Sequence, residues 1–187
     1  MVSKDISKGL TLIAFGFLFV LLNITINDLS ITPSFIGWLL FYIAIPYLGE
    51  YTEGKDYLKW AALILTIVTA VQWVLEITHA AANIESIKTI VGLVNAVFMF
   101  ILLGVLENIA RDNKCEALEG RLGVLKIANI VSYLGTLAFG MLYSVSRTDL
   151  FALLAFACGV VAIIAAIVTC FTLFKLKKEI AEGTAVA

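Results

Sequence analysis

Six apolar segments separated by short polar turns dominate this chain of 187 residues. A helix that crosses the ~30 Å hydrocarbon core of a bilayer needs about 20 mostly apolar residues. The segments cover residues 9–27, 33–49, 60–80, 87–106, 127–145 and 150–174. Hydrophobic residues make up 61% of the chain and charged residues 14%, which leaves too little polar surface for a water-soluble globule. The sequence predicts an all-α polytopic membrane protein, a single domain over 1–187, folded as a six-transmembrane-helix bundle of three hairpins.

The distribution of Lys and Arg predicts how this bundle is oriented. With six spans and the N-terminus inside, all of the 13 basic residues except Lys88 and Arg147 fall in inner segments. A re-entrant second segment, the shortest of the six, would move most of these charges to the outside. Short loops rich in Lys and Arg remain cytoplasmic. We therefore predict a multi-pass protein of the cell (plasma) membrane with both termini cytoplasmic (N-in/C-in).

The ends of the first two segments carry local signals. The first begins with positive charge, but no small-residue cleavage site follows it, so we interpret it as an uncleaved anchor. In the second, Thr32 is placed to cap the helix and Pro33 to occupy its first position. Pro46 lies near the other end and predicts a kink there.

Polar residues form a stripe on the third segment. Thr69, Gln72, Glu76 and His79 are separated by three, four and three residues, which places them on one helix face. Such residues within a membrane mark binding sites by default. A structural role is the alternative: Glu76 and His79 lie near the outer surface, where they can reach water or form one ion pair that fixes helix register.

Other segments contribute polar groups at helical spacing. The fifth carries a face of six residues, Asn129, Ser132, Thr136, Gly140, Tyr143 and Arg147. For the Asn residues within the apolar segments, Asn23, Asn95 and Asn129, the alternative to ligand binding is a structural role in hydrogen bonds between helices. Taken together, the stripes predict a polar interior that opens to the outer side. The candidate ligand-binding residues are Gln72, Glu76, His79, Asn95, Thr136, Tyr143, Arg147 and Asn23.

The sixth segment and the longest inner loop are candidates for contacts with a partner. Small residues recur on the sixth segment at spacings of three and four, from Ala152 to Thr169, which is typical of a close helix-packing seam. The same seam could instead form a homo-oligomer interface. In the loop 107–126, Leu118, Leu122 and Leu125 follow helical spacing between interleaved charges, which predicts that the flanking helices continue as a solvated connector. A partner-docking helix is the alternative.

No catalytic or cofactor pattern is present in the sequence. The chain has one His, too few for a zinc site of the usual composition, and no phosphate-binding or dinucleotide-binding motif. No nucleophile elbow accompanies its Ser residues, and no basic patch points to nucleic acid. The three Cys residues cannot all pair, so we expect no structural disulfide. We therefore predict no metal, no cofactor and no catalytic residue.

The first third of the chain resembles a group of short multi-pass membrane proteins from Gram-positive bacteria. The resemblance rests on Lys8-Gly9-Leu10, Leu12-Ile13 and Gly16, followed by Pro33-Ser34-Phe35-Ile36-Gly37. Members of that group have an apolar first helix followed by a Pro-x-Phe-Ile-Gly segment. The resemblance implies a bacterial membrane protein and brings no activity with it.

Three functions remain open from the sequence, of which a membrane-embedded enzyme is the least favoured, because it would need a second intramembrane acid beside Glu76. The first is binding or transport of a small solute or ion through the polar interior. The second is a non-catalytic accessory or assembly subunit that docks a membrane partner, or a second copy, through the sixth segment or through the loop 107–126. Beyond the lipid bilayer itself, the sequence identifies no partner.

Overall fold

The structure is a computed structural model that describes residues 2–21, 25–26, 29–30, 33–78 and 85–183. Six α-helices follow one another along these residues, with a 3-10 segment after the second and a short antiparallel ladder after the first. The predicted all-helical fold class is confirmed, apart from the four residues of the ladder. The elements are α1 Val2–Leu21, β1 Thr25–Ile26, β2 Leu29–Ser30, α2 Ser34–Ala44, η1 Ile45–Thr52, α3 Asp56–Ile77, α4 Glu85–Asp112, α5 Glu116–Ser146 and α6 Asp149–Gly183.

Four helices in the described part of the chain are long and apolar enough to cross a membrane. They are the segments Asp56–Leu75, Thr89–Asp112, Glu116–Ser146 and Asp149–Gly183. The helix α2 is shorter, with 11 residues, because the chain turns into the 3-10 segment at Ile45. These lengths and compositions are compatible with an integral membrane protein.

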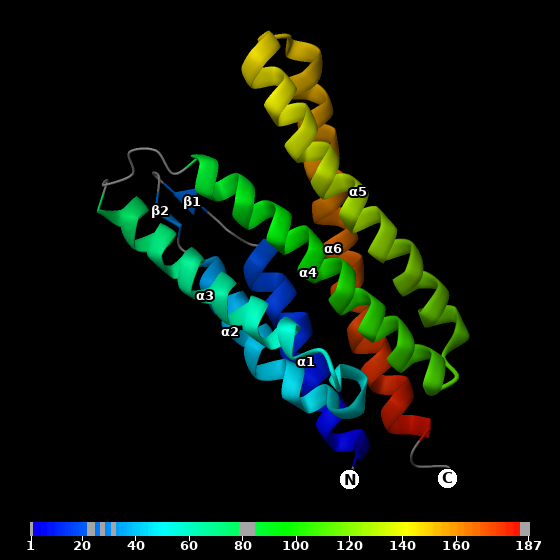
Figure 1. Ribbon diagram of the computed structural model, residues 1–187. Helices are drawn as coiled ribbons and strands as arrows, with labels where there is room; N and C mark the ends of the chain where they lie inside the picture. The colour runs from blue at the N-terminus through cyan, green and yellow to red at the C-terminus, as the bar shows by residue number, and fades with distance from the viewer. Residues whose placement is uncertain (1, 22–24, 27–28, 31–32, 79–84, 184–187) are drawn as a thin grey trace.

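The helices form a ring in the order of the chain (Figure 1). Each helix packs against its neighbour in sequence, and α1 packs against α6, which closes the ring. The contact between α3 and α4 is the least extensive of these. The helix α4 lies between α3 and α5, so these two helices are kept apart.

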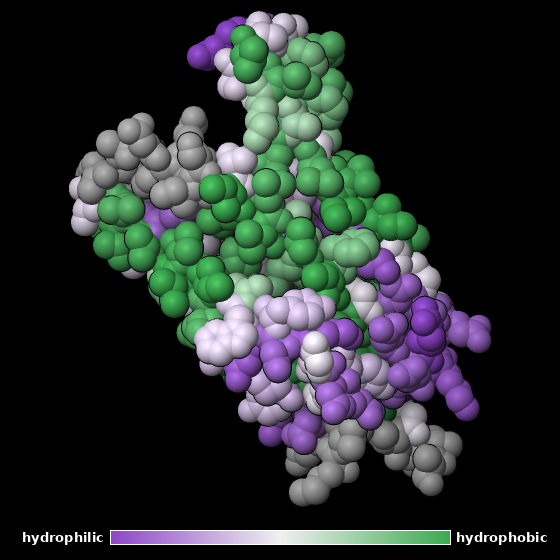
Figure 2. Space-filling view, in the orientation of Figure 1, coloured by the Kyte–Doolittle hydropathy of each residue, from purple (hydrophilic) through white to green (hydrophobic). Residues whose placement is uncertain are grey.

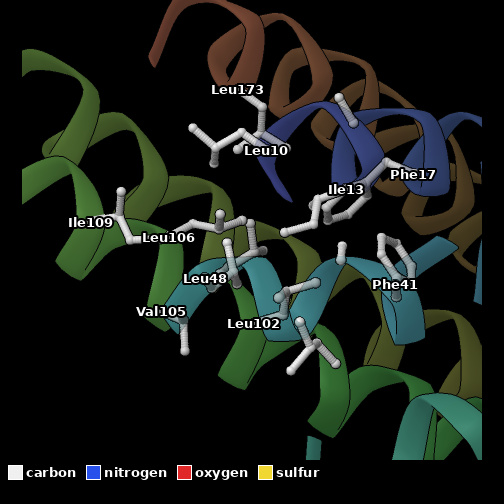
Figure 3. Packing of buried hydrophobic residues seen from close by; sticks show 14 of the residues in the cluster. Leu10, Ile13, Phe17, Phe41, Leu48, Leu102, Val105, Leu106, Ile109 and Leu173 are labelled. Atoms are coloured by element: carbon white, nitrogen blue, oxygen red, sulfur yellow. The ribbon is translucent and has the colours of Figure 1, made fainter. Parts of the chain in front are cut away.

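The core fills the half of the ring that is nearer to the chain termini. Apolar side chains from α1, α4, α6 and the α2–η1 unit meet there (Figure 3), and the buried hydroxyls of Thr169 and Thr172 donate to carbonyls of their own helix. Leu10, Leu48, Leu102, Leu106 and Leu173 have at most 1% of their surface exposed. This end of the bundle is therefore a packed apolar interior with no polar channel through it.

Two glycines allow α1 and α2 to cross closely. A Cβ atom on Gly37 would lie 2.6 Å from the carbonyl oxygen of Gly16, and one on Gly16 would lie 2.6 Å from Phe41. Small residues at such crossings bring helix backbones together, which increases van der Waals contact. Gly16 and Gly37 each stand at the end of one of the two short motifs described above for the first third of the chain. The close helix crossing explains why a small residue stands at each of these positions.

The predicted start of α2 is wrong by one position. Pro33 is extended, with φ −67° and ψ 125°, and precedes the first helical residue, Ser34. Its carbonyl accepts a hydrogen bond from the N–H of Ile36, so Pro33 occupies the cap position predicted for Thr32, which lies outside the described residues. The kink predicted at Pro46 corresponds to the 3-10 segment, which turns at Gly49 with a φ of +57°.

The connection between α4 and α5 is helical almost throughout, as predicted. The helix α4 ends at Asp112 and α5 begins at Glu116, so only three residues separate them. Leu118, Leu122 and Leu125 are buried against the bundle. Opposite charges pair across the turn: Lys126 Nζ contacts Glu107, and Arg111 Nε donates to Glu119 Oε1 at 2.7 Å.

The small-residue stripe of α6 divides into two parts. Thr169 and Ala166 are buried inside the bundle, whereas a Cβ on Gly159 would meet nothing within 4 Å. The close contact between α5 and α6 runs instead through Gly135, where a Cβ would lie 2.7 Å from Cys158 Sγ. Towards their turn, α5 and α6 diverge from α3 and α4 (Figure 1).

Charge gathers at one end of the molecule. Hydrophilic residues cover the end that holds both termini and the α4–α5 turn, while the face above it is apolar (Figure 2). Many large apolar side chains of the helices are exposed, among them Trp60, Ile127, Phe156 and Phe171. Exposure of this kind over several helices is expected for surfaces in contact with lipid.

Candidate functional site

A cavity of about 200 Å³ lies among α1, α4, α5 and α6, directly above the packed core. Three of its lining residues, Phe17, Met99 and Ala166, also belong to the core cluster. The core therefore closes the cavity on the side of the charged end. The described residues that line it are Phe17, Val20, Asn95, Met99, Asn129, Tyr133, Ala162, Ile163 and Ala166.

Distances along the helices locate the cavity relative to the charged end. Asn95 is 12 residues from Glu107 on α4, which corresponds to about 18 Å at the usual rise of 1.5 Å per residue. Tyr133 is seven residues from Lys126 on α5, or about 10 Å by the same rise. Glu107 and Lys126 form an ion pair, so the polar lining lies well inside the apolar part of the bundle.

The polar lining is organised by one hydrogen bond between α4 and α5. Asn95 Nδ2 donates to the phenolic oxygen of Tyr133. Asn95 has 4% of its surface exposed, and its Oδ1 has no hydrogen-bond partner. The next turn of α5 presents Asn129, whose Nδ2 donates to the carbonyl of Leu125 at 3.0 Å. Burying an amide oxygen without a partner is unfavourable, so a donor that reached this oxygen would form a favourable hydrogen bond.

Among the residues that the structure describes, the lining carries no Asp, Glu, Lys, Arg or His. Two amides and a phenol supply its polar groups, and the remaining walls are aliphatic or aromatic. The Tyr133 hydroxyl that accepts from Asn95 still has a hydrogen to donate. The cavity can thus accept one hydrogen bond, donate another and enclose an apolar group.

The predicted stripe on α3 lies apart from this cavity. Thr69 is buried, and its hydroxyl donates to the carbonyl of Leu65 at 2.6 Å. Gln72 Nε2 is also buried and has no hydrogen-bond partner. Glu76 lies in the last turns of α3, but its side chain is outside the described part of the structure, as are His79 and Asn23.

The predicted residues of α5 lie further towards the α5–α6 turn. Thr136 Oγ1 donates to the carbonyl of Ser132 at 2.9 Å, which satisfies this hydroxyl within its own helix. Tyr143 is partly buried, and its carbonyl accepts the N–H of Arg147 at 2.8 Å. Arg147 ends the helix in a left-handed conformation (φ +54°) and is exposed. Of the predicted site residues whose side chains the structure describes, only Asn95 lies in the cavity.

Tyr133 lines the cavity but was not predicted from the sequence as a ligand-binding residue. It lies four residues after Asn129, so both side chains share a face of α5. A tyrosine within an apolar segment resembles any other aromatic residue, because only its partner shows that the hydroxyl is buried. The sequence did contain one indication of the site: Asn129 and Tyr133 are four residues apart on α5, and the preceding helix α4 carries Asn95.

No protein-family model matches this chain, and the comparisons with curated proteins and with solved structures also give no match. Any function must therefore be argued from the site itself. Within the residues that the structure describes, no group of three His, Cys, Asp or Glu side chains is close enough to hold a metal ion.

Two ionisable groups at the charged end have altered acidity. Burial raises the pKa of Cys115 to about 11, together with the neighbouring carboxylate of Glu179, and the thiol donates to the carbonyl of Asn113 at 3.4 Å. Burial and the carboxylate of Asp112 also raise the pKa of Tyr51. These contacts connect the ends of α6 and α4 to the neighbouring turns. Cys115, Cys158 and Cys170 are all free, as the sequence predicts.

Proposed function

We propose that this protein spans the cell membrane six times with both termini in the cytoplasm, and binds a small neutral solute in the cavity around Asn95. The clustering of charged residues at the end that holds both termini supports this orientation (Figures 1 and 2). In this arrangement the cavity lies near the middle of the bilayer, where many transporters place their substrate sites.

The observation that carries the binding proposal is the unpartnered Oδ1 of Asn95. It is buried, it belongs to the cavity lining, and no group in the described chain donates to it. A bound solute with an N–H or O–H group supplies the missing donor, while its apolar part contacts Phe17, Val20 and Met99. An apolar cavity of about 150 Å³ accommodates benzene, so this space suits a solute of one or two small rings.

The lining favours a neutral solute over an ion. A charged solute would be buried without a countercharge, which costs several kcal/mol or more. A hard cation such as Ca²⁺ requires about six oxygen ligands. The cavity offers the oxygens of two amides and one phenol, and Asn95 and Asn129 already use their amide nitrogens within the protein.

We extend this proposal to transport, which requires a path out of the cavity at both ends of the bundle. The helices α5 and α6 diverge from α3 and α4 towards the α5–α6 turn (Figure 1), and we propose that a solute would leave the bundle at that end. On the other side, Leu102 and Leu106 of the core close the route to the charged end. Uptake into proteoliposomes therefore requires a rearrangement of the core, whereas binding does not.

Isothermal titration calorimetry with indole and benzofuran tests the binding proposal. The two molecules have nearly the same shape, but only indole carries an N–H donor. We expect the detergent-solubilised protein to bind indole about three- to tenfold more tightly than benzofuran, which corresponds to one hydrogen bond. The preference should disappear in Asn95→Leu and persist in Thr136→Val, whose hydroxyl bonds within its own helix. Equal binding of the two molecules by the unaltered protein contradicts the proposal.

An accessory role in docking a partner is the second candidate. It is favoured by the α5–α6 turn, where Val145 has 86% and Phe156 70% of its surface exposed. This hairpin stands apart from the other helices (Figure 1). Disulfide cross-linking of Val145→Cys in membranes tests whether a second copy covers it. The loop 107–126 is less suited to docking, because its leucines are buried within the bundle.

A further inference from the structure

A groove runs along the outside of the ring between α3 and α4. It has a volume of about 280 Å³, and its lining is almost entirely apolar, with Leu58 and Ala61 on one wall and Leu93, Val97 and Phe98 on the other. It lies at the least extensive contact of the ring, on the opposite side of α4 from Tyr133 and the cavity.

A second hollow of about 370 Å³ continues this groove towards the charged end. The two share Ile101 of α4. Its upper wall is apolar, formed in part by Phe100 and Gly104, and its lower wall carries Lys55, Arg111 and Lys126. The polarity of the surface therefore changes from apolar to charged along one continuous path on α4.

The charged hollow has an excess of positive charge. It contains three basic side chains and one carboxylate, that of Glu107. Lys126 contacts Glu107. Arg111 donates through Nε to Glu119 at 2.7 Å, and its Nη2 lies 3.9 Å from Glu107 Oε1, which leaves Nη1 for another anion. Lys55 donates to the carbonyl of Tyr51 at 2.9 Å and retains two further hydrogens. A phosphate group has the charge and the acceptor oxygens that these side chains require.

The dimensions match one leaflet of a bilayer. From Val97 in the groove to Arg111 the path along α4 covers 14 residues, or about 21 Å. Half of a bilayer with its headgroups measures about 20–22 Å. An acyl chain in the apolar groove therefore places its headgroup phosphate at Arg111, Lys55 and Lys126.

We infer that this surface is a binding site for an anionic phospholipid of the inner leaflet. The apolar groove accommodates an acyl chain, and the basic hollow binds the headgroup phosphate. Basic pockets between helices on the cytoplasmic side bind such headgroups in other membrane proteins. This site is independent of the solute cavity, because the two lie on opposite sides of α4.

Native mass spectrometry of the full chain tests this inference. The detergent-solubilised protein is mixed with equal amounts of phosphatidylglycerol and phosphatidylcholine with the same palmitoyl and oleoyl chains. We expect bound phosphatidylglycerol to exceed phosphatidylcholine, and Arg111→Gln to reduce its affinity about fivefold. Lys178→Gln is the control, since it also removes an exposed basic residue that pairs with a carboxylate, here Glu182, and lies outside the hollow. Lys178→Gln should leave the preference for phosphatidylglycerol over phosphatidylcholine unchanged.

A second variant distinguishes a lipid from a free anion. Val97 lines the groove and has 56% of its surface exposed, so Val97→Trp fills the groove without disturbing the core. We expect this variant to lose binding of both lipids, and millimolar inorganic phosphate not to displace phosphatidylglycerol. Equal binding of both lipids, unaltered binding in Arg111→Gln or Val97→Trp, or displacement by phosphate overturns the inference. A circular dichroism melt confirms that each variant is folded.

Discussion

Asn95 on α4 donates a hydrogen bond to Tyr133 on α5, while its own Oδ1 remains without a partner beside a cavity. One side chain thus connects two helices and presents an unused acceptor to the interior. A residue that served only to join α4 and α5 could do so with both of its polar atoms satisfied. The unsatisfied atom is what distinguishes this pair from an ordinary interhelical contact.

The first prediction concerns the energetic coupling of this pair. Tyr133→Phe leaves the buried amide of Asn95 without its hydrogen-bond acceptor, so we expect a destabilisation of about 1–3 kcal/mol. Asn95→Leu removes the amide altogether, and adding Tyr133→Phe to it should then cost much less. Thermal unfolding of the four proteins in detergent measures the coupling in a double-mutant cycle. Strictly additive effects would show that the hydrogen bond does not contribute.

The second prediction concerns the crossing of α1 and α2. Gly37→Ala places a methyl group 2.6 Å from the backbone oxygen of Gly16, which cannot move independently of its helix. We expect a destabilisation of about 1–3 kcal/mol, as for other overpacked sites. Gly159→Ala on α6 is the control, because nothing lies within 4 Å of the added methyl group. The control should be neutral or stabilising by up to ~1 kcal/mol. A melting temperature for Gly37→Ala equal to that of Gly159→Ala would argue against the close crossing.

The third prediction concerns pH and the thiol of Cys115. Its pKa is about 11 in the folded protein, above the ordinary value of 9.0. The folded state therefore holds this proton more tightly, and the resulting stability is complete below pH 9 and is lost as pH rises from 9 to 11. Cys115→Ala should flatten this decline in the melting temperature.

Alkylation of Cys115 tests the same contact directly. In a chain with Cys158→Ala and Cys170→Ala, modification by iodoacetamide at pH 8.5 should be slow, because little thiolate is present. Glu179→Gln removes the carboxylate beside the thiol, so it should lower the pKa and accelerate the reaction. Glu182→Gln, one turn further along α6, should leave the rate unchanged. An identical rate in both variants would contradict the role of Glu179.

The fourth prediction concerns Gln72. Its Nε2 is buried and has no hydrogen-bond partner, and the residue does not line the solute cavity. Replacing an unpaired buried amide with an apolar side chain of similar size is neutral or stabilising. We expect Gln72→Leu to melt at the same or a higher temperature, with indole binding unaltered. A loss of indole binding would extend the site to α3 and correct our assignment.

Helix positions could be predicted from the sequence because apolar segments of about 20 residues have few alternative structures in a bilayer. The burial of Leu118, Leu122 and Leu125 followed from their spacing in the same way. The boundaries were less certain, since Pro33 fits both the cap and the first helical position. The short ladder of β1 and β2 carries no periodic signal in the sequence, as each strand has two residues.

The cavity itself could be predicted only in part. Helical spacing shows which residues share a face, and it correctly grouped Asn129 and Ser132 as buried residues of α5. It does not show which faces meet, and the ring order places α4 between the polar stripes of α3 and α5. Asn95 was selected as a single polar residue, whereas its importance comes from Tyr133 on another helix.

The most direct test of the account is a structure determined with 5-bromoindole. The bromine identifies the ligand by its anomalous scattering, and the account predicts one molecule in the cavity, with its N–H within hydrogen-bond distance of Asn95 Oδ1. Ala162→Phe, which fills the cavity from α6, should show no bound bromine. Bromine found only on the lipid-facing surface, or an empty cavity at saturating ligand, would contradict the central claim.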